Sequence, residues 1–265
     1  MPEAVVLVAR EGGVATITLN RPEALNALDR ELTLALRDAV FAAEQDPGVR
    51  CVVIRGGAHF MAGGDLKWFH QSIGGMEPVQ VRVHFEAFIH EVHALIISLR
   101  RMPKPVIAGV RGAAAGFGLS LMMACDLALA ADNAYFTLAY TAIGVSPDGG
   151  STFALPRIMG QKKAMEIALL GERFDAVAAE RLGLVNRVVP PGSLDVETAK
   201  LAARLAAGPT AAYARTKALL NGSLNATLES QLQREAEAFA QCASEPDFKE
   251  GLSAFIEKRK PQWRR

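Results

Sequence analysis

Residues 104–132 read KPVIAGVRGAAAGFGLSLMMACDLALAAD and combine two buried strands with a glycine-rich turn and a short helix. The runs VIAGV (106–110) and LALAA (127–131) are continuous apolar stretches, which are typical of strands covered on both faces. Between them, the glycine-rich turn leads into an apolar helix. A strand, a helix and a second strand in this order predict an α/β unit with parallel strands.

The same alternation extends toward the N-terminus. VATITL (14–19) alternates apolar and polar residues in strand fashion, and CVVIR (51–55) is another short apolar strand. Asp29 can cap a helix that ends at residues 46–47, and a second helical stripe covers about residues 84–99. We therefore expect an α/β domain whose parallel strands are covered by helices, with ligand loops at the carboxyl ends of the strands.

From Gly160 onward the pattern is almost entirely helical. Apolar residues recur at helical spacing in QKKAMEIALLG, DAVAAERLG, LDVETAKLAARLAAG and TAAYARTKALL, and in a long amphipathic stretch from 224 to 242. We find no low-complexity linker and no repeat. The pattern indicates one core with an appended helical region.

Composition limits the classes of function. The chain has 265 residues, half of them hydrophobic and 22% charged, with a net charge of +1, which disfavours nucleic acid and membrane surfaces as partners. Its three cysteines are far apart and form no C-x-x-C motif, which argues against a disulfide framework or a zinc site. Because we recognise neither a signal peptide nor a membrane-spanning run, we expect a cytoplasmic protein.

Two glycine-containing loops follow buried strands. They are HFMAGGDLK (59–67) and RGAAAGFGLS (111–120), and each has an alternative interpretation as a simple strand-to-helix turn. The second loop opens a helix, so its backbone N–H groups can point at a negative ligand atom. It is not a dinucleotide-binding fingerprint, because only Gly116 and Gly118 fit and no acidic residue is placed to bind a ribose.

Together and in this order, the segments resemble the enoyl-CoA hydratase/isomerase, or crotonase, superfamily over essentially the whole chain. The resemblance rests on LNRPEALNAL (19–28), FMAGGDLK (60–67), KPVIAGVRGAAAGFGLSLMMACDLALAAD (104–132), IGVSPDGGSTFALPRIMG (143–160), AERLGLVNRVV (179–189) and DFKEGLSAFIEKRKP (247–261). It implies a ββα spiral core, residues 1–195, that holds CoA and the active site. It also implies a helical region, residues 196–265, that caps the CoA and assembles trimers, often paired into hexamers. The implied substrate is an acyl thioester of coenzyme A, with no cofactor besides that CoA.

The resemblance assigns an oxyanion hole to the backbone N–H groups of Gly64 and Phe117. A thioester that gains or loses a proton at its α-carbon passes through an enolate, and each N–H aimed at the enolate oxygen is worth roughly 3 kcal/mol. The family usually has glycine at the second position. Phe117 keeps the backbone donor, and we expect its ring to narrow the acyl pocket.

Asp148, in the sequence VSPDGGST, is the candidate acid and base. Pro-Asp-Gly-Gly is also a good helix-capping sequence, so a purely structural role is the alternative. Similar isomerases carry their carboxylate here, whereas hydratases need two glutamates at positions that are Ser120 and Tyr140 in this chain. One carboxylate suffices for a 1,3-proton shift, because the base that takes a proton from C2 can return it at C4. We expect an isomerase, with a hydratase using a variant site as an alternative.

His93 leaves a further alternative open. It lies beside the apolar stripe of the helix, where a histidine is usually a packed residue with a hydrogen-bond partner. It also matches the base of aryl-acyl-CoA dehalogenases of the 4-chlorobenzoyl-CoA type, which use an aspartate at position 148 as nucleophile. Those enzymes have Trp where this chain has Tyr140. His90 and His93 lack a third ligand, so we expect no metal.

The resemblance also implies a set of CoA-binding residues. Lys67 and Lys258 suit phosphate groups as mobile point charges, although solvated surface is the usual role of lysine. A CoA-binding or RNA-binding protein without catalysis is the remaining, less favoured class. The implied CoA-binding residues are Ala24, Ala27, Met61, Ala62, Gly63, Asp65, Leu66, Lys67 and Gly116, with Phe255 and Lys258 from a neighbouring subunit.

Overall fold

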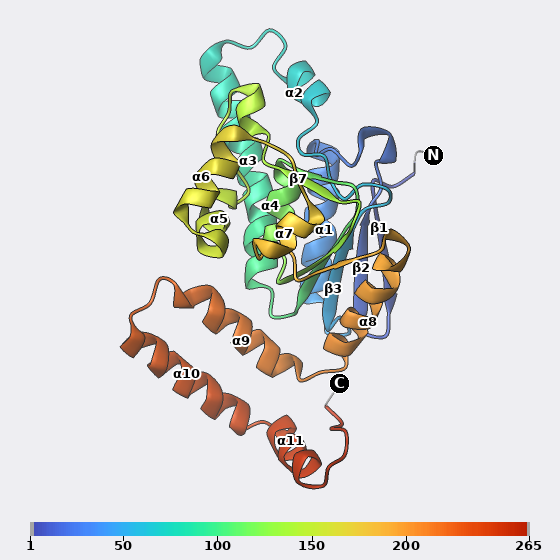
Figure 1. Ribbon diagram of the computed structural model, residues 1–265, viewed down its shortest axis with the longest axis vertical. Helices are drawn as coiled ribbons and strands as arrows, with labels where there is room; N and C mark the ends of the chain where they lie inside the picture. Colours follow the sequence, from blue (N-terminus) through green and yellow to red (C-terminus); the bar gives the residue numbers. More distant parts are fainter. Residues whose placement is uncertain (1–2, 264–265) are drawn as a thin grey trace.

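The computed structural model describes residues 3–263 and is built around a twisted sheet with the strand order β1-β2-β3-β4-β6-β9 (Figure 1). β1 and β2 pair antiparallel, and every later neighbour in this sheet is parallel. The α/β expectation is therefore confirmed. The strands are β1 (Val6–Glu11), β2 (Val14–Leu19), β3 (Cys51–Arg55), β4 (Val106–Val110), β6 (Leu127–Ala131) and β9 (Arg187–Val189).

A second, smaller sheet has the order β5-β7-β8. Its strands are β5 (Ala113–Ala115), β7 (Tyr135–Thr137) and β8 (Phe174–Asp175). β5 and β7 each follow a strand of the main sheet after a short turn, and a helical segment comes next. A parallel bridge between Met61 and Ala114 extends the same layer to the chain that follows β3. The result is a spiral of ββα turns.

Helices pack against the main sheet and fill the interior. α1 and α3 pack together on one face of the main sheet, and α8 covers the other face. α4, whose eight residues are all buried, runs through the interior. The bounds are α1 (Arg30–Gln45), α2 (Leu66–Ser72), α3 (Pro78–Arg101), α4 (Phe117–Ala124), α5 (Ser151–Met159), α6 (Gln161–Leu170), α7 (Ala176–Arg181), α8 (Leu194–Ala206), α9 (Thr210–Ser223), α10 (Leu228–Ala243) and α11 (Pro246–Ile256). Short 3-10 turns cover Pro22–Ala24, Tyr140–Ile143 and Pro191–Ser193.

Local sequence explains where the first helices begin. The Asp29 side chain accepts a hydrogen bond from the Leu32 N–H at 2.8 Å, as expected for the cap of α1. α3 begins earlier than its apolar stripe indicated, because Pro78 occupies the first turn and the Gln80 side chain accepts from the Glu77 N–H at 2.9 Å. These local caps add a full turn and more to α3.

Some elements differ from the sequence expectations. β1 was not anticipated, and α2 begins within the stretch 59–67 interpreted as a loop. The region after Gly160 is not wholly helical, since β8 and β9 lie within it. β9 is short and finds its partner in β6, so its pairing depends on tertiary position and leaves little trace in local periodicity.

The last three helices project from the body of the molecule (Figure 1). α8 packs on the sheet through Thr198, Ala202 and Ala206, so this helix, which begins at Leu194, spans the expected division at 195/196. The two-part division itself stays a prediction. α9 contacts the body through Lys217, which donates to the carbonyls of Leu99 at 2.8 Å and Lys104 at 3.2 Å.

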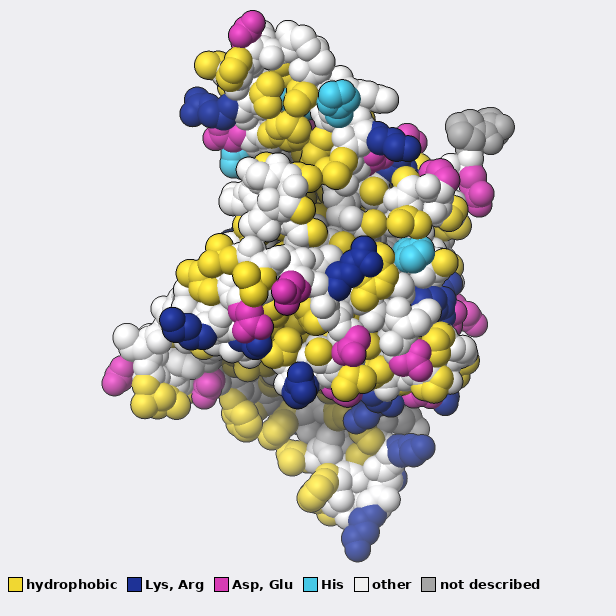
Figure 2. Space-filling view, turned by 45° about the horizontal axis from the view of Figure 1, so that its top comes forward, with side chains coloured by type: hydrophobic (Ala, Val, Ile, Leu, Met, Phe, Trp, Pro, Cys, Tyr) yellow, Lys and Arg dark blue, Asp and Glu magenta, His cyan; other side chains and the backbone are white. Residues whose placement is uncertain are grey.

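The surface carries mixed charge. On the face shown in Figure 2, basic and acidic side chains are interspersed with hydrophobic ones, in keeping with the net charge of +1. Within residues 3–263, no helix combines the length and the apolarity that crossing a bilayer requires.

Candidate active site

The two glycine-containing loops lie side by side because backbone hydrogen bonds join them. The Met61 N–H donates to the Ala113 carbonyl and the Ala115 N–H donates to the Met61 carbonyl, both at 2.9 Å. A Cβ added to Gly63 would meet the Ala115 carbonyl oxygen at 3.2 Å and the Gly116 Cα at 3.6 Å. Gly63 and Gly116 also have positive φ values, 97° and 50°, so side chains are disfavoured where the two loops approach.

The Gly64 and Phe117 N–H groups form no hydrogen bond within the described part of the chain. Phe117 is the first residue of α4, where N–H groups have no intrahelical partner and the helix dipole is positive. Gly116, immediately before it, has a φ of 50°, which turns the chain into the helix. Both N–H groups are therefore available to donate to a ligand.

The Phe117 ring is buried, with only 3% of its surface exposed. It supports the next loop of the site: a Cβ added to Gly149 would meet the ring at 2.9 Å and the Ser120 Cβ at 2.7 Å. The Ser120 hydroxyl also donates to the Asp148 carbonyl at 3.0 Å. The loop that carries Asp148 thus packs directly on the first turn of α4.

Asp148 does not cap α5. Gly150 is the N-cap residue and makes no side-chain cap, while the Ser151 hydroxyl and N–H both donate to the backbone carbonyl of Asp148, at 3.0 and 3.2 Å. The capping interpretation is therefore wrong. The Asp148 carboxylate instead accepts, at Oδ1, a hydrogen bond from the Tyr140 hydroxyl.

Burial changes the pKa values of both Asp148 and Tyr140. Burial raises the pKa of Asp148 above its ordinary value, and the hydrogen bond from Tyr140 opposes that rise. Burial, together with the neighbouring Asp148, raises the pKa of Tyr140, so the phenol stays protonated and remains a donor. A carboxylate with a raised pKa is a stronger base than an exposed one, which suits proton abstraction near neutral pH.

His93 lies beside this loop as a hydrogen-bond acceptor. Its Nε2 accepts from the Gly149 N–H at 3.3 Å, which engages the lone pair that a general base would use. His90 is exposed, and its ring centre lies 6.5 Å from that of His93. Among residues 3–263, no group of three or more His, Cys, Asp or Glu side chains is arranged to hold a metal ion.

The residues expected to bind CoA divide into two places. Ala24 and Ala27 are half-buried and lie in the turn that precedes α1, and Lys67 is exposed at the start of α2. Met61, Ala62, Gly63, Asp65 and Gly116 lie in the two joined loops, and Leu66 begins α2 directly after the first of them. Asp65 does not offer a free carboxylate, because it caps α2 and pairs with Arg21.

Phe255 and Lys258 lie elsewhere. Phe255 is 86% exposed in α11, which Figure 1 shows at the opposite end of the molecule from α2. Within one chain these two residues therefore do not reach the loops. Their expected role belongs to a neighbouring subunit and stays a prediction.

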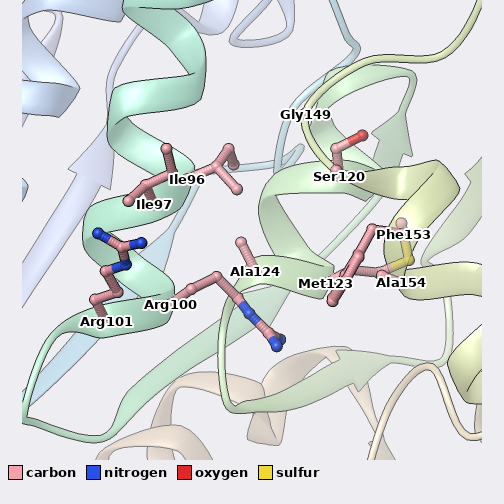
Figure 3. A pocket seen from close by; sticks show the side chains of 11 residues that line it. Ile96, Ile97, Arg100, Arg101, Ser120, Met123, Ala124, Gly149, Phe153 and Ala154 are labelled. Carbon is pink, nitrogen blue, oxygen red and sulfur yellow. The ribbon is translucent and has the colours of Figure 1, made fainter. Parts of the chain in front are cut away.

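A pocket of about 230 Å³ adjoins the Asp148 loop between α3, α4 and α5 (Figure 3). Ser120 and Gly149 line it together with apolar side chains that include Ile96, Met123 and Phe153. Sequence reasoning did not identify this pocket, and it treated Ser120 only as a missing glutamate. The Ser120 contact joins residues 28 positions apart, which no local pattern reveals.

Comparison with known proteins gives a consistent assignment. Residues 9–265 match the family model described as enoyl-CoA hydratase/isomerase. The chain is 37% identical to a crotonyl-CoA hydratase from Syntrophomonas wolfei, covering 96% of both proteins. It is 37% identical to the 1,2-epoxyphenylacetyl-CoA isomerase of Escherichia coli, covering 96% of this chain and 95% of the relative.

Other relatives extend the range of chemistry. A 4-chlorobenzoyl coenzyme A dehalogenase from an Arthrobacter species is 35% identical, covering 96% of this chain and 91% of the relative. The crystal structure of an enoyl-CoA hydratase from a Polaromonas species superposes with a TM-score of 0.91 at 40% identity, covering 98% and 99% of the two chains.

Proposed function

Because this chain belongs to the enoyl-CoA hydratase/isomerase family and is an acyl-CoA-processing enzyme, we propose that it isomerises an unsaturated acyl-CoA. The thioester oxygen lies between the N–H groups of Gly64 and Phe117. The carboxylate of Asp148 removes a proton from C2 to give an enolate and returns it at C4, which moves the double bond into conjugation with the thioester. No water is added and no group leaves.

The single observation that carries this proposal is the set of contacts that the Asp148 side chain and its loop make. Its side chain is free of any capping role, is held at one oxygen by Tyr140, and lies on a loop that packs against the helix start at Phe117. Reversible protonation of one carboxylate is all that a 1,3-proton shift requires.

The alternatives fit the local geometry less well. A hydratase of the usual kind needs two carboxylates, and the matching positions hold Ser120, which donates to a backbone carbonyl, and Tyr140, which donates to Asp148. A dehalogenase needs a histidine free to activate water, whereas His93 accepts the Gly149 N–H. Both activities are outcomes of the same substrate test.

We propose that the working form is a homotrimer, alone or paired into a hexamer. The projecting helices expose large apolar side chains, which a monomer would leave in contact with water. They include Leu220, Leu224, Leu228, Leu232, Phe239 and Phe255. Light scattering after size-exclusion chromatography measures the mass: three or six chains support the assembly, and a monomer contradicts it.

The test of function uses three substrates and two matched variants. The purified protein is incubated with a 3-enoyl-CoA, a 2-enoyl-CoA and a 4-halobenzoyl-CoA, and the products are separated by chromatography. Conversion of the 3-enoyl-CoA to its conjugated isomer is the expected result. Asp148→Asn should lower that rate by roughly 10²- to 10⁴-fold while calorimetry shows unchanged CoA binding.

Asp38→Asn, at an exposed position on α1, is the matched control and should keep the wild-type rate. Formation of a 3-hydroxyacyl-CoA would favour the hydratase, and halide release that depends on His93 would favour the dehalogenase. If Asp148→Asn isomerised at the wild-type rate, the assigned base would be wrong. Binding without turnover of a broad acyl-CoA panel would indicate a non-catalytic CoA-binding protein.

A further inference from the structure

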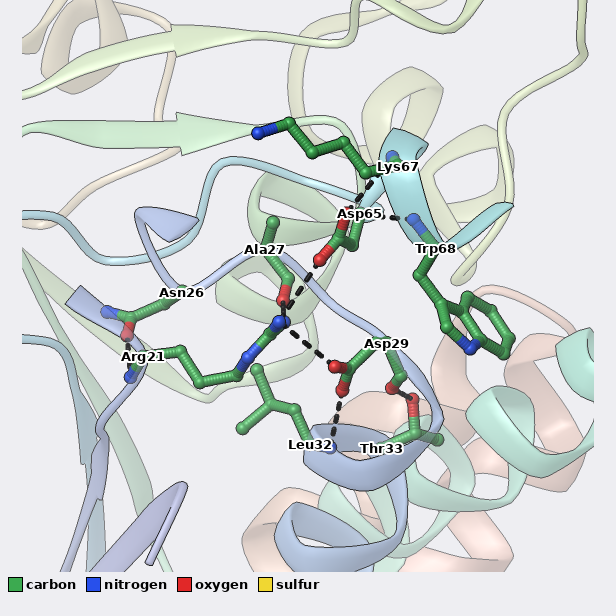
Figure 4. A network of polar contacts seen from close by, with 9 residues as sticks. All are labelled: Arg21, Asn26, Ala27, Asp29, Leu32, Thr33, Asp65, Lys67 and Trp68. Atoms are coloured by element: carbon green, nitrogen blue, oxygen red, sulfur yellow. Dashed lines mark hydrogen bonds and ion pairs between the residues drawn. The ribbon is translucent and has the colours of Figure 1, made fainter. Parts of the chain in front are cut away.

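Arg21 lies between Asp29 and Asp65, next to the loop that carries Gly64 (Figure 4). Its Nη2 is 3.0 Å from Asp29 Oδ2 and 3.1 Å from Asp65 Oδ2, and its Nη1 donates to the Ala27 carbonyl. All three charged side chains are only 15% exposed. An ion pair shielded from water to this degree is stronger than a surface pair, and it is costly to break because an uncompensated charge remains.

Each aspartate uses its other oxygen to start a helix. Asp29 Oδ1 accepts from the Leu32 N–H at 2.8 Å, which begins α1. Asp65 Oδ1 accepts from the N–H groups of Lys67 and Trp68, both at 3.1 Å, which begins α2. One guanidinium therefore fixes the starts of two helices relative to each other.

Gly64 is held within this arrangement. The Leu28 N–H donates to the Gly63 carbonyl at 2.7 Å, and the Asp65 N–H donates to the Leu28 carbonyl at 2.9 Å. The peptide groups on both sides of Gly64 are thus hydrogen-bonded to the backbone of Leu28, which lies in the turn between Arg21 and Asp29. The Arg21 side chain closes this unit by bonding Asp65, the residue directly after Gly64.

The Asp65 carboxylate is charged in this setting. Burial works to raise its pKa, but the hydrogen bonds from the Trp68 N–H and from Arg21, together with the positive charge of Arg21, outweigh burial and lower the pKa. Removal of Arg21 would leave a largely buried negative charge one residue from the proposed oxyanion donor. That charge would repel a developing enolate.

We infer that Arg21 is a positioning residue that holds the Gly64 N–H in its catalytic orientation through Asp65, and shields the oxyanion site from the charge of Asp65. The inference rests on the proposed oxyanion hole. Arg21 touches neither substrate nor reacting atoms in this role. Its loss should therefore act on the chemical step more than on CoA binding.

The test compares Arg21→Met with Arg21→Lys and with Arg187→Met, a matched control whose ion pair to Glu197 lies on the half-exposed edge strand β9. Butyryl-CoA with a 13C-labelled carbonyl is bound to each protein, and the infrared carbonyl stretch is measured. In the wild type the stretch should fall below its value in free solution, because two N–H donors polarise the carbonyl. In Arg21→Met it should return part of the way, while Arg187→Met keeps the wild-type value.

Kinetics supply the second readout. In Arg21→Met, kcat for the 3-enoyl-CoA should fall by roughly 10- to 100-fold with KM changed far less, since a small misplacement of a catalytic group is enough for such a loss. Arg21→Lys, which restores the charge without the two guanidinium nitrogens that bond Asp65 and the Ala27 carbonyl, should recover part of the carbonyl shift. Circular dichroism confirms that each variant is folded before it is compared.

The outcomes separate the two proposals. A folded Arg21→Met protein with the full wild-type carbonyl shift overturns the positioning role alone. A wild-type complex with no shift overturns the oxyanion hole and the role of Arg21 with it. If the shift behaves as expected but no isomer forms, the positioning role stands and the proposed reaction is wrong.

Discussion

The Tyr140 hydroxyl donates a hydrogen bond to Oδ1 of Asp148, eight residues further along the chain. Tyr140 begins a 3-10 turn and Asp148 lies just before α5, so the intervening loop brings the two side chains back together. Burial raises the pKa of both groups. The phenol therefore keeps its proton, and the carboxylate accepts the hydrogen bond. The bond leaves Oδ2 as the oxygen that exchanges the proton in the proposed reaction.

Tyr140→Phe should move the acid limb of the pH profile of kcat/KM to higher pH. The Tyr140 hydrogen bond lowers the pKa of Asp148 against the effect of burial, so its removal raises that pKa further. More alkaline solution is then needed to ionise the base. Initial rates of 3-enoyl-CoA conversion measured across the pH range provide the check. An acid limb that stays in place, or moves to lower pH, would contradict the assignment of Asp148 as the base.

Asp148→Asn should increase stability at neutral pH even though it lowers turnover. The raised pKa means that the folded protein keeps the Asp148 proton at pH values where the unfolded chain has lost it. Protonated Asp148 thus contributes stability that is present below the ordinary pKa of aspartate. This contribution is lost as the pH rises through the pKa of Asp148 in the folded protein. Asparagine has no such dependence.

The measurement is urea unfolding of both proteins at several pH values. The stability advantage of Asp148→Asn should be largest at neutral pH and shrink as the pH falls toward the ordinary pKa of aspartate. Asp38→Asn, on the exposed side of α1, provides the reference. An Asp148→Asn protein less stable than the wild type at neutral pH would show that the carboxylate is favourably bound in its charged form.

Gly149→Ala and Gly150→Ala form a matched pair. Both glycines have positive φ, 61° and 80°, so alanine is strained at either position by about 1 kcal/mol. Only at Gly149 would the new Cβ also collide, at 2.7 Å from Ser120 and 2.9 Å from the Phe117 ring, whereas at Gly150 the nearest atom is 3.8 Å away.

The difference between the two variants therefore isolates the packing of the Asp148 loop on α4. Gly149→Ala should lose roughly 1–3 kcal/mol more of unfolding free energy than Gly150→Ala, the usual cost of overpacking. It should also lose more activity, because Asp148 is displaced. Equal losses in denaturant titrations would mean that the loop moves freely over Phe117.

Lys217→Met should weaken the attachment of α9 to the body. Lys217 lies 2.8 Å from Asp126 Oδ2, and the two side chains are 10% and 25% exposed. Burial raises the pKa of Asp126 and Lys217 opposes this, so the variant leaves a poorly solvated carboxylate. We expect a loss of about 2 kcal/mol, less than the 3–5 kcal/mol of a fully buried pair.

The matched control is Lys200→Met, which breaks an exposed pair with Glu197 and should change stability little. Urea unfolding of both variants gives the comparison. Asp126→Asn combined with Lys217→Met should recover part of the loss, since no buried charge then remains. A loss as small as that of the control would show that Asp126 is solvated once Lys217 is gone.

The sequence predicted the main-sheet strands β2, β3, β4 and β6 and the helix α1, because continuous apolar runs and caps are local properties. It did not predict β9, whose three residues are defined by pairing with β6. For Asp148 the sequence left cap and base open. The alternatives differ in which atom the carboxylate contacts, and that contact is made by Tyr140 after the loop has folded back.

By itself the amino-acid sequence determined the order of β2, α1, β3, β4 and β6, the glycines where two loops approach, and the single acidic residue in the Pro-Asp-Gly-Gly turn. Hydrophobic periodicity and the conformational freedom of glycine involve only a few neighbouring residues, so both can be recognised in the sequence. Only the tertiary structure decided that Arg21 pairs with Asp65, 44 residues away, and that Ser120 holds the Asp148 loop, 28 residues away. Those contacts form only when the turns of the spiral stack on one another. Their strength depends on burial and on distance in space, which spacing along the chain does not give.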